Sequence, residues 1–207
     1  RAVALDLPGF GRSTAPANGD YSLEAMAAAV DHAVQAIGLR RFVLAGHSYG
    51  GAVVATYAAA HPEKVAGVIY VDSAATALPL NAQQSEQLSA AFRADKMKVV
   101  RAWFAPMLQT SPAAVREQVF ASVEATPTDA FLGALMSLTS YDAKRLVGMY
   151  TGPRLAIAAT DIETPMAFQK QFPEIEAVPI SGAGHWLMLD KPGDVNAAID
   201  RFLTSLP

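Results

Sequence analysis

Short aliphatic runs recur along this chain and alternate with stretches of helical periodicity. Five runs are apolar almost without interruption, at residues 2–5, 42–45, 65–71, 155–159 and 175–180. Alternation of strands and helices is typical of βαβ units with a parallel sheet. Such strands are covered on both faces, which explains why polar residues do not alternate with apolar ones. The sequence therefore predicts an α/β fold, with a mostly parallel sheet flanked by helices.

Two helices can be placed by their end signals. In the first, residues 22–37, Ser22 is a candidate N-cap and Gly38 a candidate stop. The second begins at Pro192, a favourable first-turn position. Both have one apolar stripe, formed by Leu23, Met26, Val30, Val34 and Ile37 in the first and by Val195, Ile199, Phe202 and Leu206 in the second.

The alternation stops between residues 77 and 152. This segment contains no convincing strand, but it has helix starts at Ser111-Pro112 and Thr126-Pro127 and holds most of the methionines. We therefore expect an all-helical insertion. The predicted division is residues 1–76 for the first part of a core domain, 77–152 for the helical insertion and 153–207 for the second part of the core.

Composition limits the function classes. The 207 residues are 52% hydrophobic, enough for one domain with a sizeable core. The net charge is only −3 and no block of like charges occurs. We therefore expect a small molecule as the partner, and neither nucleic acid nor a membrane. With no cysteine, disulfides, thiolate catalysis and Cys-ligated metal are excluded. The compartment stays open, with the cytoplasm slightly favoured.

Residues 46–50, Gly-His-Ser-Tyr-Gly, match the pattern G-x-S-x-G. They follow an apolar strand and precede a helix-forming stretch, the context of a sharp strand-to-helix turn that exposes a serine hydroxyl. Ser48 is therefore the candidate nucleophile. The helix that begins at Tyr49 directs its free amide groups toward the same place, so the Tyr49 N–H is a candidate oxyanion-hole donor. A glycine-rich turn with an incidental serine is the alternative.

A serine hydroxyl needs a base, and the base needs a carboxylate. His185 is the best candidate base because it follows the final strand, whereas His32, His47 and His61 are expected to be structural or solvent-facing. Asp161 is the preferred acid, since it follows the strand at 155–159. Asp72, at the end of the run 65–71, is its rival, and Glu163 is expected to be exposed.

These motifs resemble those of the α/β-hydrolase superfamily. Residues 5–13 resemble its D-x-P-G-x-G-x-S loop, residues 46–51 its nucleophile elbow, residues 158–165 its acid loop and residues 182–186 its histidine loop. The resemblance implies that residues 77–152 are a cap over the site. It also implies an esterase, a lipase, a C–C bond hydrolase or a cofactor-free perhydrolase, since the family's epoxide hydrolases and haloalkane dehalogenases use aspartate where this chain has Ser48.

One departure concerns the segment before the Asp6 loop. Family members carry there the first strands and a His-Gly turn that donates the second oxyanion-hole amide, and this sequence contains neither. A gap in the sheet would leave backbone groups unpaired, at a cost of about 1–3 kcal/mol each. We therefore expect an N-terminally incomplete α/β-hydrolase fold, whose sheet is completed by a preceding segment, a partner chain or a rearranged pairing.

The resulting hypothesis is a serine hydrolase that cleaves a small hydrophobic carboxylic ester through an acyl-enzyme, without metal or organic cofactor. Alternatives are a C–C bond hydrolase, a perhydrolase or a non-catalytic ligand-binding relative. The candidate substrate pocket is apolar, although each of its side chains could equally pack between helices. Its members are Trp103, Phe104, Met107, Met136 and Trp186.

Overall fold

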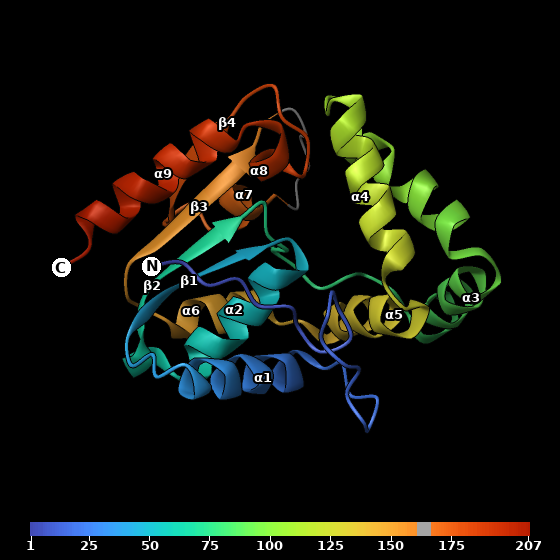
Figure 1. The fold of residues 1–207 in the computed structure, drawn as a ribbon, viewed down its shortest axis with the longest axis horizontal. Helices are drawn as coiled ribbons and strands as arrows, with labels where there is room; N and C mark the ends of the chain where they lie inside the picture. The colour runs from blue at the N-terminus through green and yellow to red at the C-terminus, as the bar shows by residue number, and fades with distance from the viewer. Residues whose placement is uncertain (161–166) are drawn as a thin grey trace.

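The computed structural model describes residues 1–160 and 167–207, and Figure 1 shows its fold. Four parallel strands form one sheet in the order β1-β2-β3-β4. Their bounds are Phe42–His47, Val65–Val71, Arg154–Ala159 and Glu176–Ile180. The prediction of a parallel α/β sheet is confirmed.

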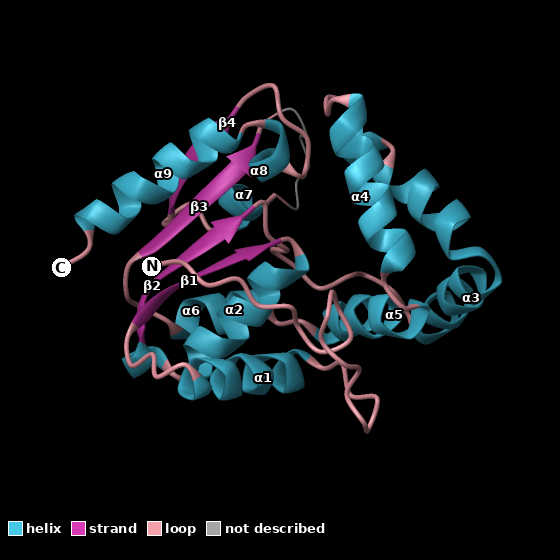
Figure 2. Ribbon diagram, viewed as in Figure 1, coloured by secondary structure: helices cyan, strands magenta, loops and turns pink. Residues whose placement is uncertain are grey.

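Helices cover both faces of the sheet (Figure 2). Because side chains alternate along a strand, Val68 and Tyr70 of β2 pack on one face while Ile69 and Val71 pack on the other. The first face is covered by α1 (Leu23–Ala36), α2 (Tyr49–Ala60), α6 (Ala143–Met149) and α7 (Phe168–Gln171). The second is covered by α8 (Leu187–Asp190) and α9 (Pro192–Ser205).

The two helices predicted from their end signals are present. Ser22 caps α1 by accepting a hydrogen bond from the Ala25 amide at 3.2 Å, and Gly38 follows the helix with a φ of 70°. The apolar stripe of α1 is buried as far as Val34, whereas Ile37 is exposed. Helix α9 begins at Pro192 and buries Val195 and Phe202, as expected.

Most of residues 82–149 are helical. The segment comprises α3 (Ala82–Phe104), η2 (Pro106–Leu108), α4 (Ala113–Ala125), α5 (Thr128–Ser137) and η3 (Leu138–Ser140), followed by α6. Helices α3 and α5 share an apolar cluster of their own, which includes Phe92, Val100, Leu132 and Leu135. Helix α6 instead joins the core cluster with α2. The division at residues 76 and 152 stays a prediction.

One predicted strand is wrong. Residues 2–5 have no strand conformation, and Val3 and Leu5 are 45% and 42% exposed. A strand forms only where its backbone groups have a ladder partner, and within the described residues β1 pairs with β2 alone. Apolar composition was therefore not enough to make residues 2–5 a strand.

The helices of the described part of the chain include none that is long and apolar enough to cross a membrane.

Candidate active site

Ser48 occupies a sharp turn between β1 and α2. Its φ is 52°, and only one other non-glycine residue in the described part of the chain, Asp72, has a positive φ (39°). A positive φ strains a residue that has a side chain, and such residues concentrate at functional sites. The predicted strand-turn-helix context of the motif is therefore present.

Backbone hydrogen bonds hold this turn against the end of β2. The Ser48 amide donates to the Val71 carbonyl at 3.1 Å, while the Ser48 carbonyl accepts from the amides of Gly51 at 3.0 Å and Ala74 at 3.1 Å. In addition, the Ser73 hydroxyl donates to the Gly46 carbonyl at 2.9 Å. These bonds compensate for the unfavourable backbone conformation of Ser48.

The two glycines of the motif have different roles. A Cβ on Gly46 would lie 2.2 Å from the Gly50 carbonyl oxygen, a backbone atom that cannot move aside. A Cβ on Gly50 would meet nothing within 4 Å. Of these two glycines, only Gly46 is required by the close approach of β1 and α2.

His185 lies in the loop between β4 and α8, and its ring contacts a carboxylate. The His185 Nδ1 and Asp72 Oδ2 atoms are 2.5 Å apart, and the two side chains are only 16% and 20% exposed. A carboxylate that accepts the Nδ1 proton of an imidazole selects the tautomer whose lone pair is on Nε2, the atom that can act as a base. This contact joins the loops that follow β2 and β4.

Asp72 is fixed by its own backbone and by β3. Its amide donates to the Ile157 carbonyl at 2.7 Å, and its Oδ1 accepts from the Ala159 amide at 3.3 Å. The structure thus brings the rival acid, Asp72, to His185. The preferred acid, Asp161, lies outside the described residues together with Glu163, so its role stays a prediction.

His47 contacts His185 from the motif side. Its Nε2 donates to the His185 carbonyl at 2.8 Å, and the two ring centroids are 4.5 Å apart. Burial, and secondarily the neighbouring His185, lower the pKa of His47 to about 3. His47 is therefore a neutral structural residue. Of the other two histidines, His61 lies against the Tyr57 ring and His32 is exposed on α1.

Tyr49 is the first residue of α2, a position at which the amide has no acceptor within its own helix. Its phenol points elsewhere: the ring lies 6.5 Å from that of Phe10, and burial raises the pKa of the Tyr49 hydroxyl to about 12. Only the backbone of Tyr49 thus fits the predicted role in an oxyanion hole.

The five predicted pocket side chains divide into two groups. Trp103, Phe104 and Met136 pack against the apolar cluster of α3 and α5. Trp186 connects that cluster to the histidine loop, because its ring lies 4.9 Å from Phe104 and 5.0 Å from His185. Met107 meets the same loop through its carbonyl, which accepts the His185 amide at 2.9 Å.

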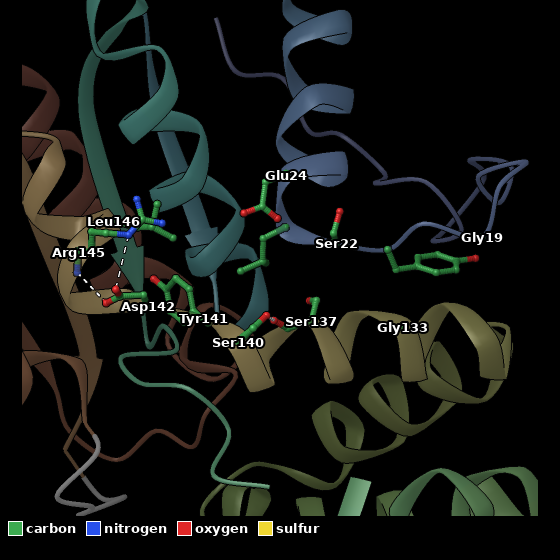
Figure 3. Close-up of a pocket in the computed structure, with 12 residues that line it drawn as sticks. Gly19, Ser22, Glu24, Gly133, Ser137, Ser140, Tyr141, Asp142, Arg145 and Leu146 are labelled. Carbon is green, nitrogen blue, oxygen red and sulfur yellow. Dashed lines mark hydrogen bonds and ion pairs between the residues drawn. The ribbon is translucent and has the colours of Figure 1, made fainter. Parts of the chain in front are cut away.

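Two cavities lie away from these residues. The cavity shown in Figure 3, about 280 Å³, is formed by the start of α1 with α5 and α6, and its lining includes Glu24, Ser137 and Arg145. The Arg145 amide donates to Asp142 Oδ1 at 3.0 Å and the Arg145 Nε atom lies 3.5 Å from Asp142 Oδ2, as the two dashed lines indicate. A second cavity of about 420 Å³ lies between residues 4–8 and α1. Among the described residues, no group of His, Asp and Glu is placed to hold a metal ion.

A parallel sheet, a strained serine between strand and helix, and a carboxylate-bound histidine at the same sheet edge define a nucleophile-elbow α/β protein. The family model described as "alpha/beta hydrolase fold" matches residues 1–192. The chain belongs to this family.

Two curated proteins of Pseudomonas putida and one solved structure illustrate the relationship. The chain is 28% identical to a dihydrolipoyllysine-residue acetyltransferase component of an acetoin cleaving system, over 98% of the chain and 56% of that protein. It is 35% identical to a 2-hydroxymuconate semialdehyde hydrolase, over 40% of the chain and 29% of that protein. The chain therefore spans about half of the first relative's length.

Among solved structures, a thermophilic esterase from Thermogutta terrifontis superimposes with a TM-score of 0.83 at 23% identity. The match covers 96% of this chain and 77% of that one. At this level of identity the similarity concerns the fold alone.

We predict that the substitutions Gly46→Ala and Gly50→Ala have opposite outcomes. Gly46→Ala forces β1 and α2 apart, and we expect a loss of at least about 3 kcal/mol in the free energy of unfolding, comparable to severe overpacking. Gly50→Ala adds a helix-favouring residue in open space and should leave stability unchanged or slightly higher. Urea unfolding followed by circular dichroism measures both, and equal losses would contradict the assignment of the steric constraint to position 46.

We predict that His47 makes the folded state sensitive to acid. Its pKa in the folded state is about 3, whereas in the unfolded chain the imidazole binds a proton near pH 6.5. Because the unfolded state binds more protons, the free energy of unfolding falls as the pH drops below about 6.5. His47→Gln keeps an N–H donor but does not titrate. Between pH 7 and pH 5 the wild type should lose up to about 2 kcal/mol more than this variant. Urea unfolding of both proteins at the two pH values measures these losses. Identical losses of stability in wild type and His47→Gln would refute the assignment.

Proposed function

We propose that the protein is a serine hydrolase that cleaves a small hydrophobic carboxylic ester through an acyl-enzyme. The observation that carries this proposal is that backbone strain and a histidine–carboxylate contact occur in the same place. Ser48 and Asp72 are the two described non-glycine residues with positive φ, and Asp72 is the carboxylate that contacts His185. Backbone strain of this kind persists where surrounding structure imposes it, which is expected of a preorganised catalytic site.

In the proposed mechanism the Ser48 hydroxyl attacks the ester carbonyl carbon while His185 Nε2 accepts its proton. The imidazolium returns this proton to the leaving alkoxide, and the acyl group remains on Ser48. A water molecule, deprotonated by the same imidazole, then releases the carboxylic acid and restores Ser48. The Tyr49 amide donates a hydrogen bond to the developing oxyanion.

We assign the role of the carboxylate partner to Asp72. Asp72 contacts His185 Nδ1, is largely buried and makes two hydrogen bonds with main-chain groups of β3. These features favour a side chain that holds the imidazole in one tautomer. Asp161 is the competing candidate, and only a functional comparison of the two positions discriminates between them.

The second oxyanion-hole donor belongs to the proposal as well. Removal of one such donor costs about a hundred-fold to a thousand-fold in rate, so an efficient enzyme needs an N–H besides that of Tyr49. We propose that a segment preceding residue 1 or a partner chain supplies it beside β1, whose outer edge has no strand neighbour within the described residues.

A second candidate function is C–C bond hydrolysis, which uses the same nucleophile and base. It is favoured by the 35% identity to a 2-hydroxymuconate semialdehyde hydrolase. Comparison of aryl esters with vinylogous diketones separates the two activities. The higher kcat/KM identifies the reaction for which the site is built.

We predict that Ser48→Ala abolishes both ester hydrolysis and labelling by a fluorophosphonate probe. With p-nitrophenyl butyrate as substrate, kcat/KM should fall at least about a thousand-fold, because the nucleophile itself is lost. Ser205→Ala, which removes a hydroxyl from the distant helix α9, is the matched control. Hydrolysis by a correctly folded Ser48→Ala variant at the wild-type rate would contradict the proposal. If the probe does not label the wild type, a non-catalytic ligand-binding protein is favoured instead.

We predict that Asp72→Asn lowers kcat about a thousand-fold or more, whereas Asp161→Asn changes it less than about five-fold. Asparagine tolerates the positive φ of Asp72, so the fold should survive, but its uncharged amide no longer stabilises the imidazolium. The two variants match in chemistry and differ only in position. A large loss at position 161 with a small one at position 72 would transfer the acid role to Asp161.

A further inference from the structure

The backbone around His185 is held by groups from three different parts of the chain. The His185 carbonyl accepts from His47 of the nucleophile turn, and the His185 amide donates to Met107 of the helical segment at 2.9 Å. The preceding amide, that of Gly184, donates to Asp190 Oδ2 at 2.7 Å. The histidine loop is therefore positioned by polar contacts rather than by regular secondary structure.

Asp190 connects this loop to the helical segment. The same Oδ2 atom that accepts the Gly184 amide also accepts the hydroxyl of Ser111 at 2.8 Å. Ser111 is only 2% exposed and lies in the turn between η2 and α4. The Ser111 carbonyl is in turn bound by the Arg116 side chain at 2.6 Å.

The burial of Asp190 supports a specific role for this carboxylate. Its other oxygen, Oδ1, is buried and has no hydrogen-bond partner within the described part of the chain. An unsatisfied buried carboxylate oxygen is destabilising, so the fold alone would be better served by an apolar side chain at this position. The aspartate is explained by the two hydrogen bonds that its Oδ2 accepts, from the Gly184 amide and the Ser111 hydroxyl.

Packing around Gly184 shows how closely the two parts meet. A Cβ at this position would lie 2.5 Å from the Met107 carbonyl oxygen and 2.7 Å from the Ser111 hydroxyl. The segment Pro106–Ser111 thus rests directly on the backbone that carries His185. Its displacement would remove the acceptor of the His185 amide and one of the two donors to Asp190 at the same time.

We propose that Ser111 and Asp190 are positioning residues for His185, and that their hydrogen bond makes the seating of the helical segment a condition for a correctly placed imidazole. The inference rests on the proposed function, because it assigns these two residues a role through the catalytic base. Neither residue touches the reacting atoms. They act through the Gly184 and His185 peptide groups.

The test compares Ser111→Ala with Ser122→Ala, which removes a hydroxyl from α4 that donates only within its own helix, to the Gln118 carbonyl at 2.9 Å. With p-nitrophenyl butyrate, Ser111→Ala should lower kcat about ten-fold while KM stays within about two-fold, since a base displaced from its position slows chemistry but does not weaken substrate binding. Ser122→Ala should change neither constant. Asp190→Asn and the double variant complete a cycle, in which we expect the combined loss to be smaller than the product of the single losses.

Hydrogen–deuterium exchange of residues 182–191 provides a readout that needs no activity. We expect faster exchange at the Gly184 and His185 amides in Ser111→Ala than in wild type or Ser122→Ala, at an unchanged melting temperature. Unchanged exchange overturns the inference, as does faster exchange with unchanged kcat in an active enzyme. If the wild type neither hydrolyses the ester nor takes up the fluorophosphonate while exchange still accelerates, the proposed function fails and the contact between segment and loop is upheld.

Discussion

The parallel pairing of β1 with β2 is the interaction on which the site depends. It runs from the pair Phe42 and Val65 to the pair His47 and Val71, so both strands end at the same level. Ser48 follows one strand and Asp72 the other, and each takes a positive φ as the first residue beyond the sheet. In parallel sheets the carboxyl ends of all strands meet at one edge, and groups that are distant in sequence are gathered there.

The same pairing balances the strain of the turn. A residue in an unfavourable backbone region costs about 1–3 kcal/mol of stability. Ser48 and Asp72, the two such residues that follow β1 and β2, are held by hydrogen bonds to neighbouring main-chain groups. Ser48 exchanges hydrogen bonds with Val71 and Ala74, and Asp72 donates to Ile157 of β3. A network of ladder-like bonds thus continues past the ends of the strands. The strained backbone at Ser48 and Asp72 is therefore stabilised by the same hydrogen-bond network that orders the sheet.

Sequence patterns predicted the elements of this fold well and its connections less well. The four sheet strands, the Ser22 cap, the nucleophile turn and the histidine loop all follow from local signals such as apolar runs, capping residues and glycines. Residues 2–5 had the same apolar signal but no ladder partner, and the need for a partner is not a local property. The elements could be located from the sequence, whereas their neighbours in space could not.

The choice of acid illustrates the same limit. Both Asp72 and Asp161 follow a predicted strand, and both lie between Ser48 and His185 in the chain, so neither strand position nor chain order could discriminate between them. The contact of Asp72 with His185 depends on where β2 ends and on the backbone conformation of the residue that follows it. Asp72 has a φ of 39°, which no composition rule predicts for aspartate. The one sequence feature that pointed to Asp72 was its place at the end of the apolar run 65–71.

The His185 loop depends on the helical segment for part of its hydrogen bonding. A loop has no ladder or helix to satisfy its amide and carbonyl groups, and around His185 these groups are bound by the nucleophile turn, by Asp190 and by Met107 of the inserted segment. The proposed mechanism has the imidazole transfer protons in two directions, which requires an orientation fixed to a fraction of an ångström. Part of that orientation is supplied by residues 106–111, because Met107 accepts the His185 amide and Ser111 donates to Asp190. The helical segment and the loop that carries His185 therefore form one structural unit, although 79 residues separate Ser111 from Asp190.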